Sequence, residues 1–529
     1  MPADKDRKQP VILNGPEEFF FHLKLTHPPS WQPVPVHPVR LTQDFAQFSF
    51  EASSDATTIT VDADLKILVK EIPAERSEEY ASFKKSAFNA LAPLSAAFLG
   101  AGKGAGSSAE RPESPAKSLF EAGRREAQNR NYTTSAQLYE QAVAKDPKYV
   151  EAWDSLGYTY NVLRQYAKAE AALRKALELD PAARLAHINL GLALEGQKNY
   201  EEAISEFLKE LEVNPKNSRA HADLGRVYVI TKQFEKAVPE LETASQATLN
   251  DAAVFFNLGR AYAGTQQPDN AVKALEHSVE IEPIPNRWNW VAYELAQDKL
   301  ALEQAQQYSQ FSISAMTEKM RQVSLDHVTS EDVRQVSALA AYWDTFGWIQ
   351  FQKGNFAEAE KYVKSSWQVR WIGEIGDHLG QIYEKQGRKS EAIQTYESSL
   401  ATTMPKPETK DRLLGLLGPD ADLETLTHPA KQQLADARTL AIANTAKADG
   451  IAEFWVLISP GPKVVGVKFI SGDDQLAQFA SALAAASYPN FFPDETAIQL
   501  LRRGRLSCSE SSAQCRFLLE SAEAVRATN

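Results

Sequence analysis

The chain has 529 residues, of which 43% are hydrophobic and 24% charged, and its formal net charge is −12. This length predicts two to four globular domains, because a single hydrophobic core stops growing at roughly 250–300 residues. The acidic balance argues against a nucleic-acid or anionic-membrane partner, since concentrated Lys and Arg side chains bind phosphate groups. No apolar stretch approaches the ~18 residues that a transmembrane helix needs.

Residues 1–99 are predicted to form a small β-rich domain. The first ten residues are charged and lack the apolar core of a secretory signal. Strands are expected at 18–26, around Phe48, and at 58–70, where polar and apolar side chains alternate. An amphipathic helix near 77–91 would close this domain, and its candidate core contacts are Tyr80, Phe83 and Phe88. Residues 100–115 are small, flexible or proline and predict a flexible linker.

A 34-residue period dominates residues 116–404. The sequence repeats glycine and, in the same register, alanine at this spacing, which is typical of stacked helix–turn–helix units. The small residues let two antiparallel helices of a unit approach closely. The glycines are Gly123, Gly157, Gly191, Gly225 and Gly259, and the alanines are Ala169, Ala203, Ala237, Ala271 and Ala305.

The repeated pattern resembles the tetratricopeptide repeat (TPR). In the clearest copy, aromatic, aliphatic and small residues occupy the family positions, and a proline ends the second helix because it lacks an N–H donor. That copy contains Trp153, Leu156, Gly157, Tyr160, Ala169, Leu173, Ala176 and Pro181. The resemblance implies an α-solenoid, mainly α in fold class, whose concave face binds other chains.

About eight units are expected, with an irregular sixth unit and an insertion after it. The sixth unit has Tyr293 at the glycine position, and an insertion lies near 317–340, where Ser330 is a plausible cap for a helix through Leu339. Two further units resume around Gly347 and Gly380. Residues 405–438 are predicted to be a helical cap on the last unit.

Residues 439–529 are predicted to form a small α+β domain. Residues 454–458 and 464–470 would be a hairpin turning at 460–462, and a helix would span 475–486. The chain's two cysteines, Cys508 and Cys515, flank a serine-rich turn of a second hairpin. A cross-hairpin disulfide and two reduced thiols are both compatible with this spacing, whereas metal binding by two lone thiols is disfavoured.

The inner positions of the first helices suggest partner-binding residues. Arg226 and Arg260 occupy equivalent positions of consecutive units and could bind a carboxylate, and Asn189 and Asn257 lie three residues before such positions. The Lys and Asn of the family's carboxylate-binding clamp are absent from the first units. A solvated helix face is therefore the alternative reading of these residues.

Six of the nine tryptophans fall between Trp288 and Trp371. Trp343 and Trp348 are the candidates for an exposed aromatic groove, although filling of the irregular junction explains the cluster as well. Histidines are scattered, and His22, His27 and His37 lack an acidic residue at metal-ligand spacing. No catalytic or nucleotide-binding motif is present, so neither an enzyme nor a cofactor or metal is expected.

The order of the parts resembles the non-catalytic half of bacterial transglutaminase-like proteins that carry TPR repeats. The β-β-α-β order near the C-terminus is also similar to TonB-type C-terminal domains. These resemblances imply a periplasmic or cell-envelope location rather than a cytoplasmic one. The sequence thus predicts a non-enzymatic scaffold that binds a peptide or protein, with a transglutaminase-associated or a glycan-binding envelope protein as alternatives.

Overall fold

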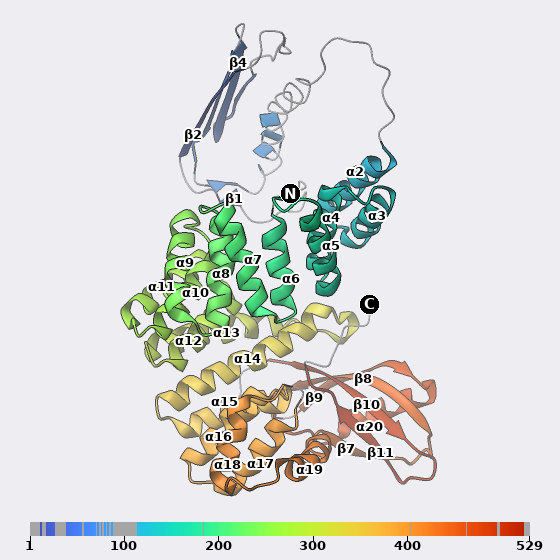
Figure 1. The fold of residues 1–529 in the computed structure, drawn as a ribbon. Helices are drawn as coiled ribbons and strands as arrows, with labels where there is room; N and C mark the ends of the chain where they lie inside the picture. The colour runs from blue at the N-terminus through green and yellow to red at the C-terminus, as the bar shows by residue number, and fades with distance from the viewer. Residues whose placement is uncertain are drawn as a thin grey trace. The chain divides into compact units, whose positions relative to one another are not determined.

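The computed structural model describes residues 11–12, 17–26, 39–54, 58–69, 71–73, 76, 79–80, 82–83, 86–87, 114–183, 185–402, 404–461, 463–494 and 498–522. The chain divides into two compact units, Met1–Ser114 and Pro115–Asn529 (Figure 1). Most of the predicted linker and two of the three N-terminal histidines, His27 and His37, lie outside the described residues.

The first unit is built on an antiparallel four-stranded sheet of order β2-β5-β4-β3. Its strands are β2 (Glu17–Thr26), β3 (Val39–Thr42), β4 (Ala46–Ser54) and β5 (Thr58–Ile67), and a short pair joins β1 (Val11–Ile12) to β6 (Glu71–Ile72). Phe45 lies at the centre of the core, with its ring centre 6.0 Å from that of Tyr80 and 5.8 Å from that of Phe83. Two of the predicted core contacts of the closing helix are therefore correct, and the third, Phe88, lies outside the described residues.

The second unit begins with eight antiparallel helix pairs, and the predicted mainly α fold with a TPR solenoid and terminal β regions is confirmed. The first helices of the pairs are α2 (Pro115–Gln128), α4 (Val150–Val162), α6 (Ala186–Gly196), α8 (Ser218–Ile230), α10 (Ala252–Gly264), α12 (Pro285–Gln297), α14 (Ser330–Gln352) and α16 (Gly373–Lys385). The second helices are α3 (Tyr132–Lys145), α5 (Tyr166–Leu179), α7 (Tyr200–Val213), α9 (Phe234–Ala247), α11 (Pro268–Ile281), α13 (Leu302–Met320), α15 (Phe356–Val369) and α17 (Lys389–Leu400).

Close packing within each pair explains the glycine ladder. A Cβ atom on Gly191 would lie 2.5 Å from the Phe207 ring, and one on Gly259 would lie 2.6 Å from Leu275 Cγ. The five ladder alanines are all fully buried. Steric exclusion at the helix contact therefore requires a side chain no larger than hydrogen at the glycine positions.

A second repeated contact links three successive pairs, those that begin with α4, α6 and α8, each to the pair before it. Trp153 Nε1 donates to the carbonyl of Pro147 at 2.9 Å. The Nε2 atoms of His187 and His221, which occupy the same position in the next two units, lie 3.3 and 3.0 Å from the carbonyls of Pro181 and Pro215. A ring nitrogen thus satisfies the carbonyl of the proline that follows the preceding second helix.

The junction differs from the prediction in one respect. The sequence suggested a separate helix from Ser330 to Leu339, but α14 runs without interruption for 23 residues into the seventh unit. Its N-cap is Thr329 rather than Ser330, because Thr329 and Asp332 form a reciprocal capping box. Between α13 and α14 lies a single 3₁₀ turn, η3 (Leu325–His327).

After the repeats, α18 (Pro407–Leu417) and α19 (Leu423–Asp436) pack on α17. An antiparallel sheet of order β7-β11-β10-β8-β9 follows, with the short helices η4 (Asp474–Phe479) and α20 (Ala480–Ala485). Its strands are β7 (Thr439–Ala443), β8 (Gly450–Ser459), β9 (Lys463–Gly472), β10 (Leu500–Cys508) and β11 (Gln514–Leu519). The hairpin of β8 and β9 is as predicted, whereas the expected helix at 475–486 is partly 3₁₀.

The C-terminal sheet shares one hydrophobic core with the end of the solenoid. Met320, Leu339 and Trp343 from α13 and α14 belong to the same buried cluster as Phe454 and Phe517 of the sheet. Figure 1 shows α14 running alongside this sheet. The C-terminal sheet therefore packs against α14, the long helix of the junction. This packing coincides with the interruption of the 34-residue period between the sixth and seventh units.

Candidate partner-binding face of the helical repeats

The first helices of the units form one layer. Helix α4 packs against α6, α6 against α8, α8 against α10, and α12 against α14, whereas second helices mainly contact the first helices of their own and adjacent units. Helices that approach one another across units lie on the inner side of a curved stack. The first helices therefore provide the inner face, which is the binding surface in solenoid proteins.

On α4 the inner face is partly apolar. Tyr158 and Val162 are four residues apart on one side of the helix and are 41% and 39% exposed. One turn before them, Asp154 accepts a hydrogen bond from Asn189 Nδ2 of α6 at 3.2 Å. Burial raises the pKa of Asp154 to about 6, against the lowering effect of that hydrogen bond.

The predicted site residues of α6 to α12 have internal partners. Arg226 Nη2 donates to Asp223 Oδ1 at 2.7 Å and Nη1 pairs with Glu195 of α6. Arg260 Nε lies 3.0 Å from Glu294 Oε1 of α12. These two arginine side chains nevertheless remain 30% and 32% exposed, so each presents an edge to the inner face.

The two predicted asparagines are buried. Asn189 is 4% exposed and Asn257 is 8% exposed. Asn189 links α4 to α6, because its own carbonyl also accepts a bond from Asn161 Nδ2 at 2.7 Å. Asn257 Nδ2 donates to the Ala253 carbonyl of its own helix at 2.9 Å. The Asn189 side chain thus joins two helices, the Asn257 side chain bonds within its own helix, and both have little surface for a partner.

An exposed aromatic contact continues the inner face on α10 and α12. The ring centres of Phe256 and Trp290 are 6.3 Å apart, and Trp290 is 48% exposed. The guanidinium of Arg287 lies 5.2 Å from the Trp290 ring centre and 5.5 Å from that of Phe256. Arg287 is itself fixed by Glu282 at 2.6 Å. Cation–π contacts thus hold Trp290 in a defined position.

Trp343 and Trp348 lie in the core of the junction rather than in a groove. They are 3% and 5% exposed, and Trp348 Nε1 donates to Gln297 at 3.0 Å. The Trp348 ring stacks on the buried His378 ring with centres 4.1 Å apart. The alternative prediction for the tryptophan cluster is therefore correct for Trp343 and Trp348, because both side chains fill the core of the junction. Trp290 belongs to the same cluster and is exposed, but it is not among the predicted site residues.

His378 and Tyr293 connect the first helices of the last three units, α12, α14 and α16. His378 Nδ1 lies 3.0 Å from Asp344 Oδ1, and both residues are buried. Tyr293 donates its hydroxyl to Glu374 Oε1 at 2.8 Å. Burial raises the pKa of Glu374, but His378, Lys406 and the Tyr293 hydrogen bond outweigh burial and leave this pKa below its ordinary value.

Other candidate sites receive little support. Within the described residues, no cluster of His, Cys, Asp and Glu has the geometry of a metal site, and none of the helices is long and apolar enough to cross a membrane. Cys508 and Cys515 are joined by a disulfide across β10 and β11, with a Cα–Cα distance of 4.3 Å.

Comparison with known proteins identifies the repeats. Models described as tetratricopeptide repeat match residues 120–181, 155–218, 194–255, 252–285 and 377–410. The chain therefore contains TPR repeats. A search of curated proteins gives no significant match, and nothing in these comparisons links the chain to transglutaminase-like proteins.

Among solved structures, the chain is similar to a TPR protein from Parabacteroides merdae, with 16% identity, a TM-score of 0.42, and coverage of 51% of this chain and 99% of that chain. It is also similar to MamA, with 24% identity, a TM-score of 0.30, and coverage of 32% and 92% respectively. YrrB, described as a TPR protein with an unusual peptide-binding site, shows 19% identity, a TM-score of 0.29, and coverage of 33% and 90%. These likenesses carry no assignment of partner or activity.

Proposed function

We propose that this protein is a non-catalytic scaffold that binds a peptide segment or protein partner along the inner face of its TPR solenoid. The observation that carries the proposal is a strip of exposed and half-buried apolar side chains on the first helices α4, α8, α10 and α12. This inner strip consists of the exposed side chains of Tyr158, Val162, Ile230 and Trp290 and the half-buried side chain of Phe256. Aromatic and aliphatic side chains held on rigid helices bind a segment at low cost in conformational entropy.

The polar groups beside the inner strip define its edges. Arg226 and Arg260 are each held by internal carboxylates but remain about one-third exposed, so they add directional contacts to a partner's carbonyl or carboxylate oxygens. Asn189 acts indirectly, by positioning α6 against α4, and the buried Asn257 is not part of the proposed contact surface. Apolar contacts therefore provide most of the proposed affinity, and the arginines provide orientation.

Site-specific photocrosslinking tests this proposal. A photoreactive phenylalanine analogue replaces Tyr158 or Trp290, and a third version replaces Leu208, which is as exposed as Tyr158 at 41% but lies on the second helix α7. A partner bound on the inner strip crosslinks at positions 158 and 290 and not at 208. Equal crosslinking at 208, or crosslinking at none of the inner positions by a partner that copurifies, would overturn the proposal.

Substitution gives a quantitative test once a crosslinked partner is identified. We expect Ile230→Asp and Trp290→Ala each to weaken its binding by about tenfold or more, since each removes an exposed apolar contact of the inner strip. Leu208→Asp is the matched control and is expected to leave affinity within about twofold. Arg226→Gln combined with Arg260→Gln is expected to weaken binding less than Trp290→Ala does.

A further inference from the structure

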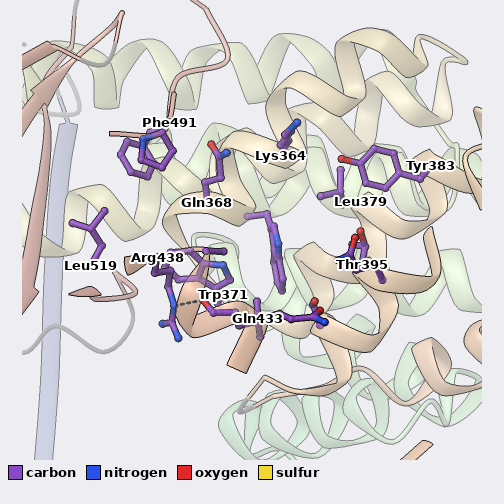
Figure 2. A pocket seen from close by; sticks show the side chains of 16 residues that line it. Lys364, Gln368, Trp371, Leu379, Tyr383, Thr395, Gln433, Arg438, Phe491 and Leu519 are labelled. Atoms are coloured by element: carbon purple, nitrogen blue, oxygen red, sulfur yellow. Dashed lines mark hydrogen bonds between the residues drawn. The ribbon is translucent and has the colours of Figure 1, made fainter. Parts of the chain in front are cut away.

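A pocket separate from the inner strip lies where the last helices meet the C-terminal sheet. Its volume is about 310 Å³, which is at the lower end for small-molecule sites. Helices α15, α16, α17 and α19 form one side, and Phe491 and Leu519 form the other (Figure 2). Trp367, Trp371 and Tyr383 give it flat aromatic walls.

The two charged side chains that line this pocket are both positive. Among the described residues that line it, Lys364 and Arg438 are cationic and none is Asp or Glu. Arg438 Nε donates to the Leu434 carbonyl at 2.8 Å, and its guanidinium lies 4.6 Å from the Trp371 ring centre. Figure 2 shows Arg438 and Trp371 together on the same wall. The lining of this pocket is therefore opposite in sign to the net charge of the chain, which is −12.

A third cation, Arg502, lies against the rings of Trp371 and Phe491, which line the pocket. The Arg502 side chain is 1% exposed, and its guanidinium lies 4.8 Å from the Phe491 ring centre and 5.9 Å from that of Trp371. Its hydrogen bonds go to carbonyls, with Nη2 2.9 Å from the Glu520 oxygen and Nη1 3.4 Å from the Gln368 oxygen. No carboxylate in the described parts of the chain forms an ion pair with Arg438 or Arg502.

Burying an arginine without a carboxylate is costly, because carbonyl dipoles and aromatic faces replace its hydration incompletely. Burial, together with the neighbouring positive charge of Arg438, lowers the pKa of Arg502 to about 9. Each guanidinium therefore raises the energy of the other. An anion entering the pocket would relieve this repulsion, in a space where low polarity strengthens the attraction.

We propose that this pocket binds a small organic oxyanion, a carboxylate or a phosphate ester, whose flat apolar body lies against Trp367 and Trp371 and whose charge faces Arg438. Lys364 provides a second cation, and the guanidinium of Arg502 adds positive potential through the Trp371 and Phe491 wall. The amide side chains of Gln368 and Gln433 line the same pocket and supply further donors. The site is distinct from the inner strip and stands independently of the function proposed for it.

Calorimetric titration of the full chain tests the site with three probes of similar shape: phenylacetate, phenyl phosphate and neutral phenylacetamide. We expect saturable binding of at least one anion and no measurable binding of the amide. Whether the carboxylate or the phosphate binds more tightly identifies the source of the oxyanion. Equal binding of the amide, or no binding by any probe, overturns the proposal.

Substitutions locate the binding. Arg438→Gln is expected to weaken anion binding about tenfold, because it removes the guanidinium beside Trp371. Arg334→Gln, at a 70% exposed arginine on α14, is the matched control and should change nothing. Lys364→Gln is expected to weaken binding severalfold and provides a second test if Arg438→Gln does not fold. Unchanged affinity in the folded Arg438 variant contradicts the site.

Discussion

Tyr293 Oη donates a hydrogen bond to Glu374 Oε1 at 2.8 Å and so joins α12 to α16 across 81 residues of sequence. Tyr293 stands where the earlier units have glycine. Lys406 Nζ lies 3.2 Å from the same carboxylate oxygen, which brings the segment before α18 into the contact. The break in the glycine ladder is therefore the point where non-adjacent units become linked.

Replacing Tyr293 by Phe should reduce stability. The change removes a hydrogen bond to a charged acceptor, which contributes roughly 1.5–3 kcal/mol, and leaves the partly buried carboxylate with Lys406. We expect the free energy of unfolding in urea to fall by about 2 kcal/mol. Tyr158→Phe, at an exposed inner-face tyrosine, is the control and should lower the free energy of unfolding by less than about 0.5 kcal/mol. Equal effects of the two substitutions would contradict the role of the Tyr293 bond.

Replacing Asp154 by Asn should raise stability at neutral pH. The folded-state pKa of Asp154 is about 6 against an ordinary value of 3.8, so between these values the folded protein holds a proton that the unfolded chain releases. The contribution of Asp154 to the unfolding free energy is therefore greatest below its ordinary pKa and falls as pH rises through 6. Asparagine is neutral at every pH and keeps an acceptor for Asn189.

We expect Asp154→Asn to be more stable than the original chain by about 1–2 kcal/mol at pH 7, and the difference to shrink toward zero near pH 4. Thermal unfolding measured across this pH range checks both parts. Glu178→Gln, at a 67% exposed carboxylate, is the control and should show neither effect. A pH-independent difference for Asp154→Asn would count against the buried charge as its cause.

Replacing Gly191 by Ala should destabilise the solenoid, because the new Cβ atom would overlap the Phe207 ring. We expect a loss of about 1–3 kcal/mol in the unfolding free energy. Gly415→Ala provides the opposite case: it lies in α18, and nothing lies within 4 Å of the position of its Cβ. That variant should gain up to about 1 kcal/mol from helix propensity. A loss at Gly415 equal to the loss at Gly191 would show that packing is not the cause.

Removing the disulfide should destabilise the C-terminal sheet. The double replacement of Cys508 and Cys515 by Ser removes a cross-link between residues seven positions apart. For a loop of this length, the gain in chain entropy of the unfolded state predicts a loss of about 2 kcal/mol in the free energy of unfolding. Hydrogen exchange on β10 and β11 should accelerate, while exchange in α4 to α9 stays unchanged. Addition of dithiothreitol should reproduce the effect in the original chain and do nothing to the double variant. Unaltered exchange in both strands would contradict this prediction.

The sequence by itself determined the solenoid, because its packing is local. Each glycine meets a residue 16 positions later, as Gly157 meets Leu173 and Gly191 meets Phe207, and the period repeats this contact along the chain. The paired strands β8 and β9 and the approach of Cys508 to Cys515 are likewise short-range. Such contacts leave a periodic or alternating pattern that can be read without a structure.

Only the tertiary structure decided which of these side chains are accessible. Arg226 and Arg260 occupy inner positions, as the period implies, but their carboxylate partners Glu195 and Glu294 come from neighbouring units. Trp343 and Trp348 are buried because the C-terminal sheet and α16 cover α14, and no local pattern encodes that cover. The pocket cations Lys364, Arg438 and Arg502 come from three separate segments. Burial and charge pairing depend on such long-range contacts, so the structure was needed to locate both proposed binding sites.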